Sequence, residues 1–87
     1  MFTDMVGYSR MVSKDQDHTL KLLDEHNDLL ISLIEKFNGK VIKLIGDAIF
    51  AHFTMAEEAA ICAMEIQTKI LKRNKLAHSK DHFKIRI

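Results

Sequence analysis

Two aspartates, Asp4 and Asp47, occupy positions from which a folded chain could bring two carboxylates together. Asp4 follows strand-forming residues at the start of the sequence, and Asp47 lies in a Gly-Asp pair typical of a β-hairpin turn. Carboxylates on neighbouring strands can share one or two Mg²⁺ ions, because hard cations take oxygen ligands and leave room for substrate phosphates. Such a pair would serve an in-line phosphoryl displacement. Spacing alone leaves open that Asp4 caps a turn and that Asp47 is an ordinary hairpin residue.

The turn at Gly7 and the side chain of Lys43 are two further candidates. A strand that ends at Gly7 before a helical turn leaves backbone N–H groups free, and such groups can hold phosphate. The sequence has no Gly-x-x-x-x-Gly-Lys motif, so this turn is not a P-loop, and an ordinary strand-to-helix turn is the alternative. Lys43 stands in a strand-like run, where its ammonium could donate a hydrogen bond to an adenine ring nitrogen. A solvated strand lysine is the alternative there.

Two amphipathic helices are predicted to position these candidates. The first covers residues 17–37, where apolar residues recur at spacings of three and four and polar residues take the other face. The second covers about residues 57–72 and has a similar apolar stripe. Candidate helix caps are Ser13, Asp15 and Asn38-Gly39 for the first helix, and Thr54 with Glu57 as its capping-box partner for the second.

The remaining segments are rich in strand-forming residues. They cover residues 2–6, 40–45 and 48–53, and a last strand begins at Phe83, where apolar and basic residues alternate. The order strand, helix, strand, strand, helix, strand is that of a ferredoxin-like split βαβ fold. We therefore predict an α+β domain with both helices on one face of the sheet, because this arrangement buries the two apolar stripes together.

The composition indicates one small domain and gives little reason to expect some classes of partner. The chain has 87 residues, of which 47% are hydrophobic, and its formal net charge is +1. This balance gives no electrostatic reason to expect binding to nucleic acid or contact of this segment with an anionic membrane. The single cysteine, Cys62, cannot form an internal disulfide, which favours a reducing compartment. We expect a cytoplasmic location, even where a longer parent protein is membrane-anchored.

The candidate residues fall in two segments that resemble the signatures of class III adenylyl and guanylyl cyclases. The first is FTDMVGYS, at residues 2–9, and the second is GKVIKLIGDAIF, at residues 39–50. The two segments occur in the order found in that family and are separated by one long helix. We therefore expect residues 1–87 to form part of a class III cyclase catalytic domain with a truncated version of that fold.

The resemblance implies a role for each matching residue. Asp4 and Asp47 match the two metal-binding aspartates, which hold two Mg²⁺ or Mn²⁺ ions, and Met5 matches the position whose backbone carbonyl also touches metal. Phosphate contacts are implied for the backbone amides of Val6, Gly7, Tyr8 and Ser9. Lys43 matches the lysine that reads adenine, and this favours ATP over GTP as the substrate. The implied reaction is attack of the ribose 3′-hydroxyl on the α-phosphate, which gives cyclic AMP and pyrophosphate in cyclic nucleotide signalling.

The same resemblance implies residues that are not found among these 87. The family uses an Asn and an Arg in a later segment to stabilise the transition state, and its active sites form at a dimer interface. We therefore expect a homodimer through the catalytic domain and no turnover by this chain alone. The alternative is a non-catalytic cyclase-like module for nucleotide binding or dimerisation. A diguanylate cyclase is disfavoured, because its Gly-Gly-Asp/Glu-Glu-Phe-like hairpin differs from the Gly46-Asp47 hairpin here.

Overall fold

The computed structural model describes residues 1–78 and 81–87, and in them the predicted order of elements is found, with one additional short helix between the first strand and the first long helix. The elements are β1 (Phe2–Met5), α1 (Tyr8–Lys14), α2 (Gln16–Lys36), β2 (Lys40–Ile45), β3 (Ala48–His52), α3 (Ala56–Leu76) and β4 (Ile85–Arg86). The strands form one sheet in the order β2-β3-β1-β4, with antiparallel pairs throughout. This order is that of the ferredoxin-like split βαβ fold, so the fold prediction is confirmed.

The first strand, β1, lies in the interior of the sheet, between β3 and β4. Phe2 and Thr3 pair with Phe50 and Ile49 of β3, while the second half of β1 pairs with β4 on the other side. Because side chains alternate along a strand, Thr3 and Met5 point to the buried face, and Phe2 and Asp4 point to the opposite one. The central strand therefore contributes to the core with one face and to a surface with the other.

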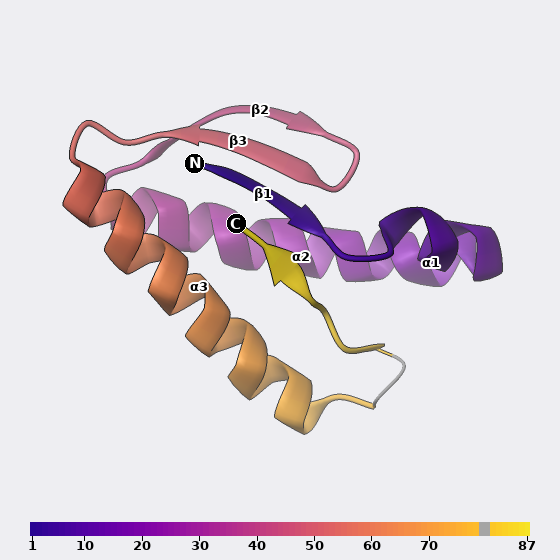
Figure 1. The fold of residues 1–87 in the computed structure, drawn as a ribbon. Coiled ribbons are helices and arrows are strands. Elements are labelled where there is room, and N and C mark those ends of the chain that lie inside the picture. Colours follow the sequence, from indigo (N-terminus) through magenta and orange to yellow (C-terminus); the bar gives the residue numbers. More distant parts are fainter. Residues whose placement is uncertain (79–80) are drawn as a thin grey trace.

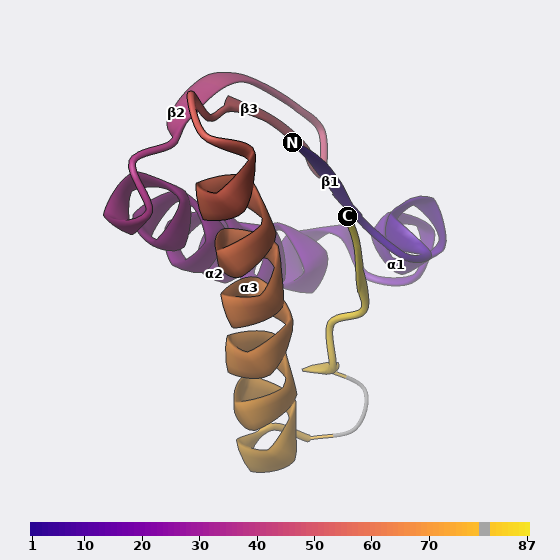
Figure 2. The same cartoon turned by 60° about the vertical axis from the view of Figure 1, so that its left-hand side comes forward.

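Helices α2 and α3 cover the same face of the sheet, and α1 lies beyond the end of β1 (Figures 1 and 2). The core lies between these helices and the inner face of the sheet. Its fully buried residues include Leu30 and Ile34 of α2, Cys62 and Ile66 of α3, and Ile49 of β3, each 0% exposed. Burial raises the pKa of the Cys62 thiol. In the part of the chain that the structure describes, no helix is both long and apolar enough to cross a membrane.

The ends of the helices agree only in part with the sequence. Asp15 caps α2, and its Oδ1 accepts a hydrogen bond from the His18 amide at 3.1 Å. Asn38 adopts the left-handed conformation, with φ of 64°, just after α2. The prediction that Thr54 caps the next helix is wrong, because α3 begins at Ala56 and its N-cap residue is Met55, which makes no side-chain capping bond.

Gly39 makes the close connection between α2 and β2 possible. A Cβ atom at this position would lie 2.6 Å from the ring of Phe53 and 2.8 Å from Cγ2 of Ile34. No side chain fits there without displacing buried neighbours. The glycine therefore allows β2 to start directly against the end of the helix.

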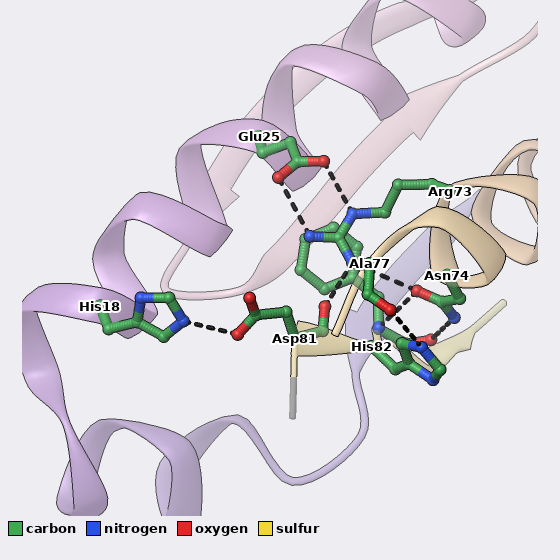
Figure 3. Close-up of polar contacts among 8 residues, drawn as sticks. His18, Glu25, Arg73, Asn74, Ala77, Asp81 and His82 are labelled. Atoms are coloured by element: carbon green, nitrogen blue, oxygen red, sulfur yellow. Dashed lines mark hydrogen bonds and ion pairs between the residues drawn. The ribbon is translucent and has the colours of Figure 1, made fainter. Parts of the chain in front are cut away.

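A polar cluster joins α2, α3 and the segment that leads into β4 (Figure 3). Arg73 on α3 donates two hydrogen bonds to Glu25 on α2, at 2.7 and 3.1 Å, and a third to the Asp81 carbonyl. Its guanidinium also lies 3.9 Å from the ring centroid of Phe83. The side-chain amide of Asn74 pairs with the backbone of Phe83, where the two hydrogen bonds measure 2.7 and 2.9 Å. We refer to Arg73 and Asn74 as the α3 clamp, since they fix the approach to β4.

Candidate functional site

A pocket of about 390 Å³ lies where the end of β1, the turn between β2 and β3 and the start of α1 meet. Small-molecule sites commonly have volumes of about 300–1,000 Å³, so the pocket is large enough for part of a nucleotide. In Figure 1 the β2–β3 turn and the end of β1 lie side by side at the right-hand end of the sheet. The pocket is lined by Asp4, Met5, Gly7, Tyr8, Ser9, Arg10, Asp47 and Arg86.

Asp47 enters the pocket from the hairpin turn. Gly46 precedes it with a φ of 56°, a left-handed conformation that glycine adopts at little cost. Oδ2 of Asp47 accepts a hydrogen bond from the backbone N–H of Met5 at 2.7 Å. This bond crosses from the hairpin to β1 and holds one carboxylate oxygen in place, so the turn and the central strand form a single unit.

Asp4 enters the same pocket from β1. Its partner in the register is Arg86 on β4, and the two side chains form a fork-like ion pair. Nε of Arg86 donates to Oδ1 at 2.7 Å, and its terminal nitrogen donates to Oδ2 at 3.1 Å. These hydrogen bonds raise the pKa of the Arg86 guanidinium. Asp4 and Asp47 thus line one pocket.

The turn after β1 places part of its backbone at the pocket. Gly7 adopts a φ of 74°, and the chain then enters α1. Gly7, Tyr8 and Ser9 line the pocket, whereas Val6 does not. The Val6 amide already donates a hydrogen bond to the Lys84 carbonyl at 2.8 Å. Of the four amides that the resemblance associates with phosphate, the Val6 amide is therefore committed to holding the chain against the segment before β4.

Lys43 lies on the outer face of the sheet but does not line the pocket. It pairs in the register with Phe50, and its ammonium nitrogen lies 5.4 Å from the centroid of the Phe50 ring. Phe50 in turn pairs with Phe2, whose ring meets it edge-on at 5.0 Å between centroids. Since Phe2 and Asp4 point to the same side of β1, the lysine and the carboxylate share one face of the sheet.

The donor set fits a hard divalent cation that keeps open coordination positions. The described residues contain no group of three or more His, Cys, Asp or Glu side chains that could enclose a metal ion. Asp4 and Asp47 supply carboxylate oxygens, the ligand type that Mg²⁺ and Mn²⁺ take, and Mg²⁺ sites commonly use one or two carboxylates plus water and substrate phosphate. The geometry suits a cation that arrives with further oxygen ligands better than a closed structural site.

Two basic residues at this pocket were not among the predicted site residues. Arg86 was missed because the run Phe83, Ile85, Ile87 alternates with basic residues, which reads as a strand with a solvated face. Arg10 was missed because it lies in a short helix, one residue beyond the segment 2–9 that carries the resemblance. The alternating pattern of the last strand could have shown that Arg86 points to the same face of the sheet as Asp4. Local sequence does not show, however, that this strand pairs with β1.

The comparison with known proteins decides the family. The chain matches the adenylate and guanylate cyclase catalytic domain over residues 1–87. It belongs to this family. Among curated relatives of the cyclase domain, "Putative adenylate cyclase 3" of Rhizobium meliloti (strain 1021) is 34% identical over 74 residues, which cover 83% of this chain and 12% of that protein. A second relative is "Serine/threonine-protein kinase pkn2" of Myxococcus xanthus, 24% identical over 88 residues, which cover 100% of this chain and 11% of that protein.

Solved structures agree with this assignment at the level of the fold. Two structures of a bacterial light-regulated adenylyl cyclase superpose on 97% of the chain with a TM-score of 0.89 and 19% sequence identity. The match covers 26% of one of those chains and 47% of the other. The cyclase domain described here thus spans about a tenth of the length of its curated relatives and less than half of these structures.

Proposed function

We propose that this chain is the metal- and ATP-binding half of an adenylate cyclase, a phosphorus–oxygen lyase that forms cyclic AMP. The observation that carries the proposal is that Asp4 and Asp47, from strand and hairpin, line one pocket. The resemblance assigns these two residues to the metal ions, and Met5, whose amide holds Asp47, to a backbone contact with metal. Family membership supports a cyclase, and the adenylyl cyclase names among its relatives support ATP as the nucleotide.

The proposed chemistry is an in-line displacement at phosphorus. The ribose 3′-oxygen passes its proton to solvent water and bonds to the α-phosphorus, while the bond from that phosphorus to the oxygen that bridges to the β-phosphate breaks and pyrophosphate leaves. Two Mg²⁺ or Mn²⁺ ions, when bound, would supply positive charge for the attacking and leaving oxygens. Asp4 and Asp47 would hold these ions, and the amides of Gly7, Tyr8 and Ser9 would contact the phosphates.

The residues beside the metal ligands would define the rest of the nucleotide site. Arg10 and Arg86 are the basic residues of the pocket lining, and their guanidinium groups could pair with phosphate oxygens once Asp4 and Asp47 bind cations. Turnover would require the family's Asn and Arg, supplied at the interface of a catalytic homodimer. We therefore expect the 87 residues alone to bind nucleotide and to produce no cyclic AMP above background, because loss of a transition-state clamp costs about 10²–10⁵-fold in rate.

The metal site is tested by titrating Mn²⁺ and a non-cyclisable ATP analogue into the 87-residue chain by calorimetry. Asp4→Asn and Asp47→Asn should each weaken Mn²⁺ binding about tenfold or more, since loss of even an outer-sphere partner commonly costs 10–100-fold in metal affinity. Asp28→Asn, which removes an exposed carboxylate on α2, is the matched control and should bind as the parent does. Unchanged affinity in both Asp4→Asn and Asp47→Asn would refute the site and favour a non-catalytic module.

The adenine assignment is tested by Lys43→Glu. A lysine donor at the base favours adenine and an acid favours guanine, so the affinity ratio between Mn²⁺-bound ATP and GTP analogues should fall by about tenfold, the worth of one charge-assisted hydrogen bond. Lys40→Glu makes the same charge change at the first residue of β2, where Lys40 pairs with His52, and should leave the ratio unchanged. An equal shift in both variants would show a general charge effect and remove Lys43 from the site.

A further inference from the structure

Arg86 engages both oxygens of Asp4, the carboxylate to which we assign a metal ion. The two hydrogen bonds, at 2.7 and 3.1 Å, occupy Oδ1 and Oδ2 in the planar fork geometry of an arginine–carboxylate pair. Asp47 differs, because only its Oδ2 accepts a hydrogen bond, and Oδ1 has no partner among residues 1–78 and 81–87. The two carboxylates of the site thus differ. Asp47 keeps one oxygen without a hydrogen bond among the described residues, whereas Asp4 is neutralised by Arg86.

A guanidinium and a divalent cation make incompatible demands on the same carboxylate. Both approach the oxygen lone pairs, and the like charges repel each other at the short distances involved. The Asp4 side chain is only 19% exposed, so it has little freedom to turn one oxygen away from Arg86. A cation that binds Asp4 must therefore displace the arginine or share a weakened carboxylate with it.

The side chain of Arg86 is able to move away from Asp4. Its side chain is 67% exposed, and Asp4 is the acceptor of its two side-chain hydrogen bonds within the described residues. It stands on β4, a two-residue strand at the edge of the sheet. Ion pairs this exposed contribute little to stability, so release of Arg86 into water is compatible with an intact fold.

We propose that Arg86 is an internal competitor of the divalent cation at Asp4, and that it lowers the affinity of the free chain for metal. This inference rests on the proposed metal site and adds to it a residue that sets how tightly that site binds a bare cation. Arg86 holds Asp4 in its place when no cation is bound, and it is a positioning residue in this state.

The test is the Mn²⁺ affinity of the 87-residue chain, measured from the electron paramagnetic resonance signal of free Mn²⁺ without nucleotide. Arg86→Gln should bind Mn²⁺ roughly three- to tenfold more tightly than the parent, in line with the worth of an exposed but bidentate pair. Arg86→Lys keeps the charge but loses the fork, so its affinity should lie between the two. Lys84→Gln removes the same charge two residues away and should change the affinity less than twofold.

A double variant separates competition at Asp4 from a general charge effect. Asp4→Asn/Arg86→Gln should bind no more tightly than Asp4→Asn alone, because the arginine has no carboxylate left to compete for. Circular dichroism and thermal melting confirm that each variant is folded. Unchanged or weaker binding by Arg86→Gln, with weaker binding by Asp4→Asn, would overturn the inference and leave the metal site standing. Affinity that is insensitive to both Asp4 and Asp47 would refute the metal site itself.

Discussion

His26 is a polar residue held entirely inside the core, at 0% exposure. Its Nδ1 lies 2.9 Å from Oδ1 of Asn27, its Nε2 has no hydrogen-bond partner among the described residues, and its ring meets that of Phe83 edge-on at 6.1 Å between centroids. Burial lowers the pKa of His26, and the Asn27 hydrogen bond and the charge of Asp47 offset this only in part. Folding therefore favours the neutral form of this imidazole.

His26 is expected to make the fold less stable in mild acid. The unfolded chain takes up a proton near pH 6.5, while the folded chain resists it, so stability is full above this pH and falls as pH drops below it. One such proton is worth at most about 1.4 kcal/mol per pH unit. Urea unfolding at pH 7.5 and 5.5 should show this loss in the parent and in His52→Gln, which lacks an exposed histidine, but a smaller loss in His26→Gln. Equal losses in all three would rule out this role.

The strands position the site because each residue type falls on the side of the sheet that its register dictates. Much of this arrangement was predicted from the sequence. The spacing of apolar residues predicted both long helices, the Gly46-Asp47 pair predicted the hairpin, and the order of elements predicted the sheet. The pairing of Asp4 with Arg86 did not follow, because the two are 82 residues apart and nothing local specifies the partner of an edge strand. The prediction that Thr54 caps α3 was wrong because the intrinsic preference of a residue for the N-cap position does not decide where tertiary contacts begin the helix.

The α3 clamp holds the segment before β4 in place, and this segment positions Arg86 at the pocket. Asn74 replaces a strand partner by bonding both the N–H and the carbonyl of Phe83, which is 1% exposed. Asn74→Ala should therefore cost about 1–3 kcal/mol, the penalty for leaving buried backbone groups unpaired. Urea unfolding measures the loss, and hydrogen exchange at the Ile85 and Arg86 amides should become faster.

A variant on the same helix serves as the control for this prediction. Thr68→Ala removes an exposed hydroxyl that, among the described residues, bonds to the Met64 carbonyl of its own helix, so it should change stability by less than about 0.5 kcal/mol. If Asn74→Ala is as stable as Thr68→Ala, then the contacts of Phe83 and Arg73 suffice to hold the approach to β4.

At the scale of the whole molecule, the sheet separates the residues of the core from the residues of the candidate site. Its inner face meets α2 and α3 and forms the core, while its outer face carries Asp4, Lys43, Phe50 and Arg86. Substitutions on the outer face therefore change binding without first removing packed volume. This separation is the reason that the charge-altering variants proposed for Lys43 and Arg86 can be interpreted as effects on the site.

Because Cys62 is buried, its alkylation can report how often the molecule opens. The chain has one cysteine, which lies on α3 within the core and is 0% exposed. An alkylating reagent needs both access and the thiolate, and the closed structure withholds both. Each modified molecule has therefore opened at least once, locally or globally, so the rate at which the single mass increment appears reports how often the core around Cys62 opens.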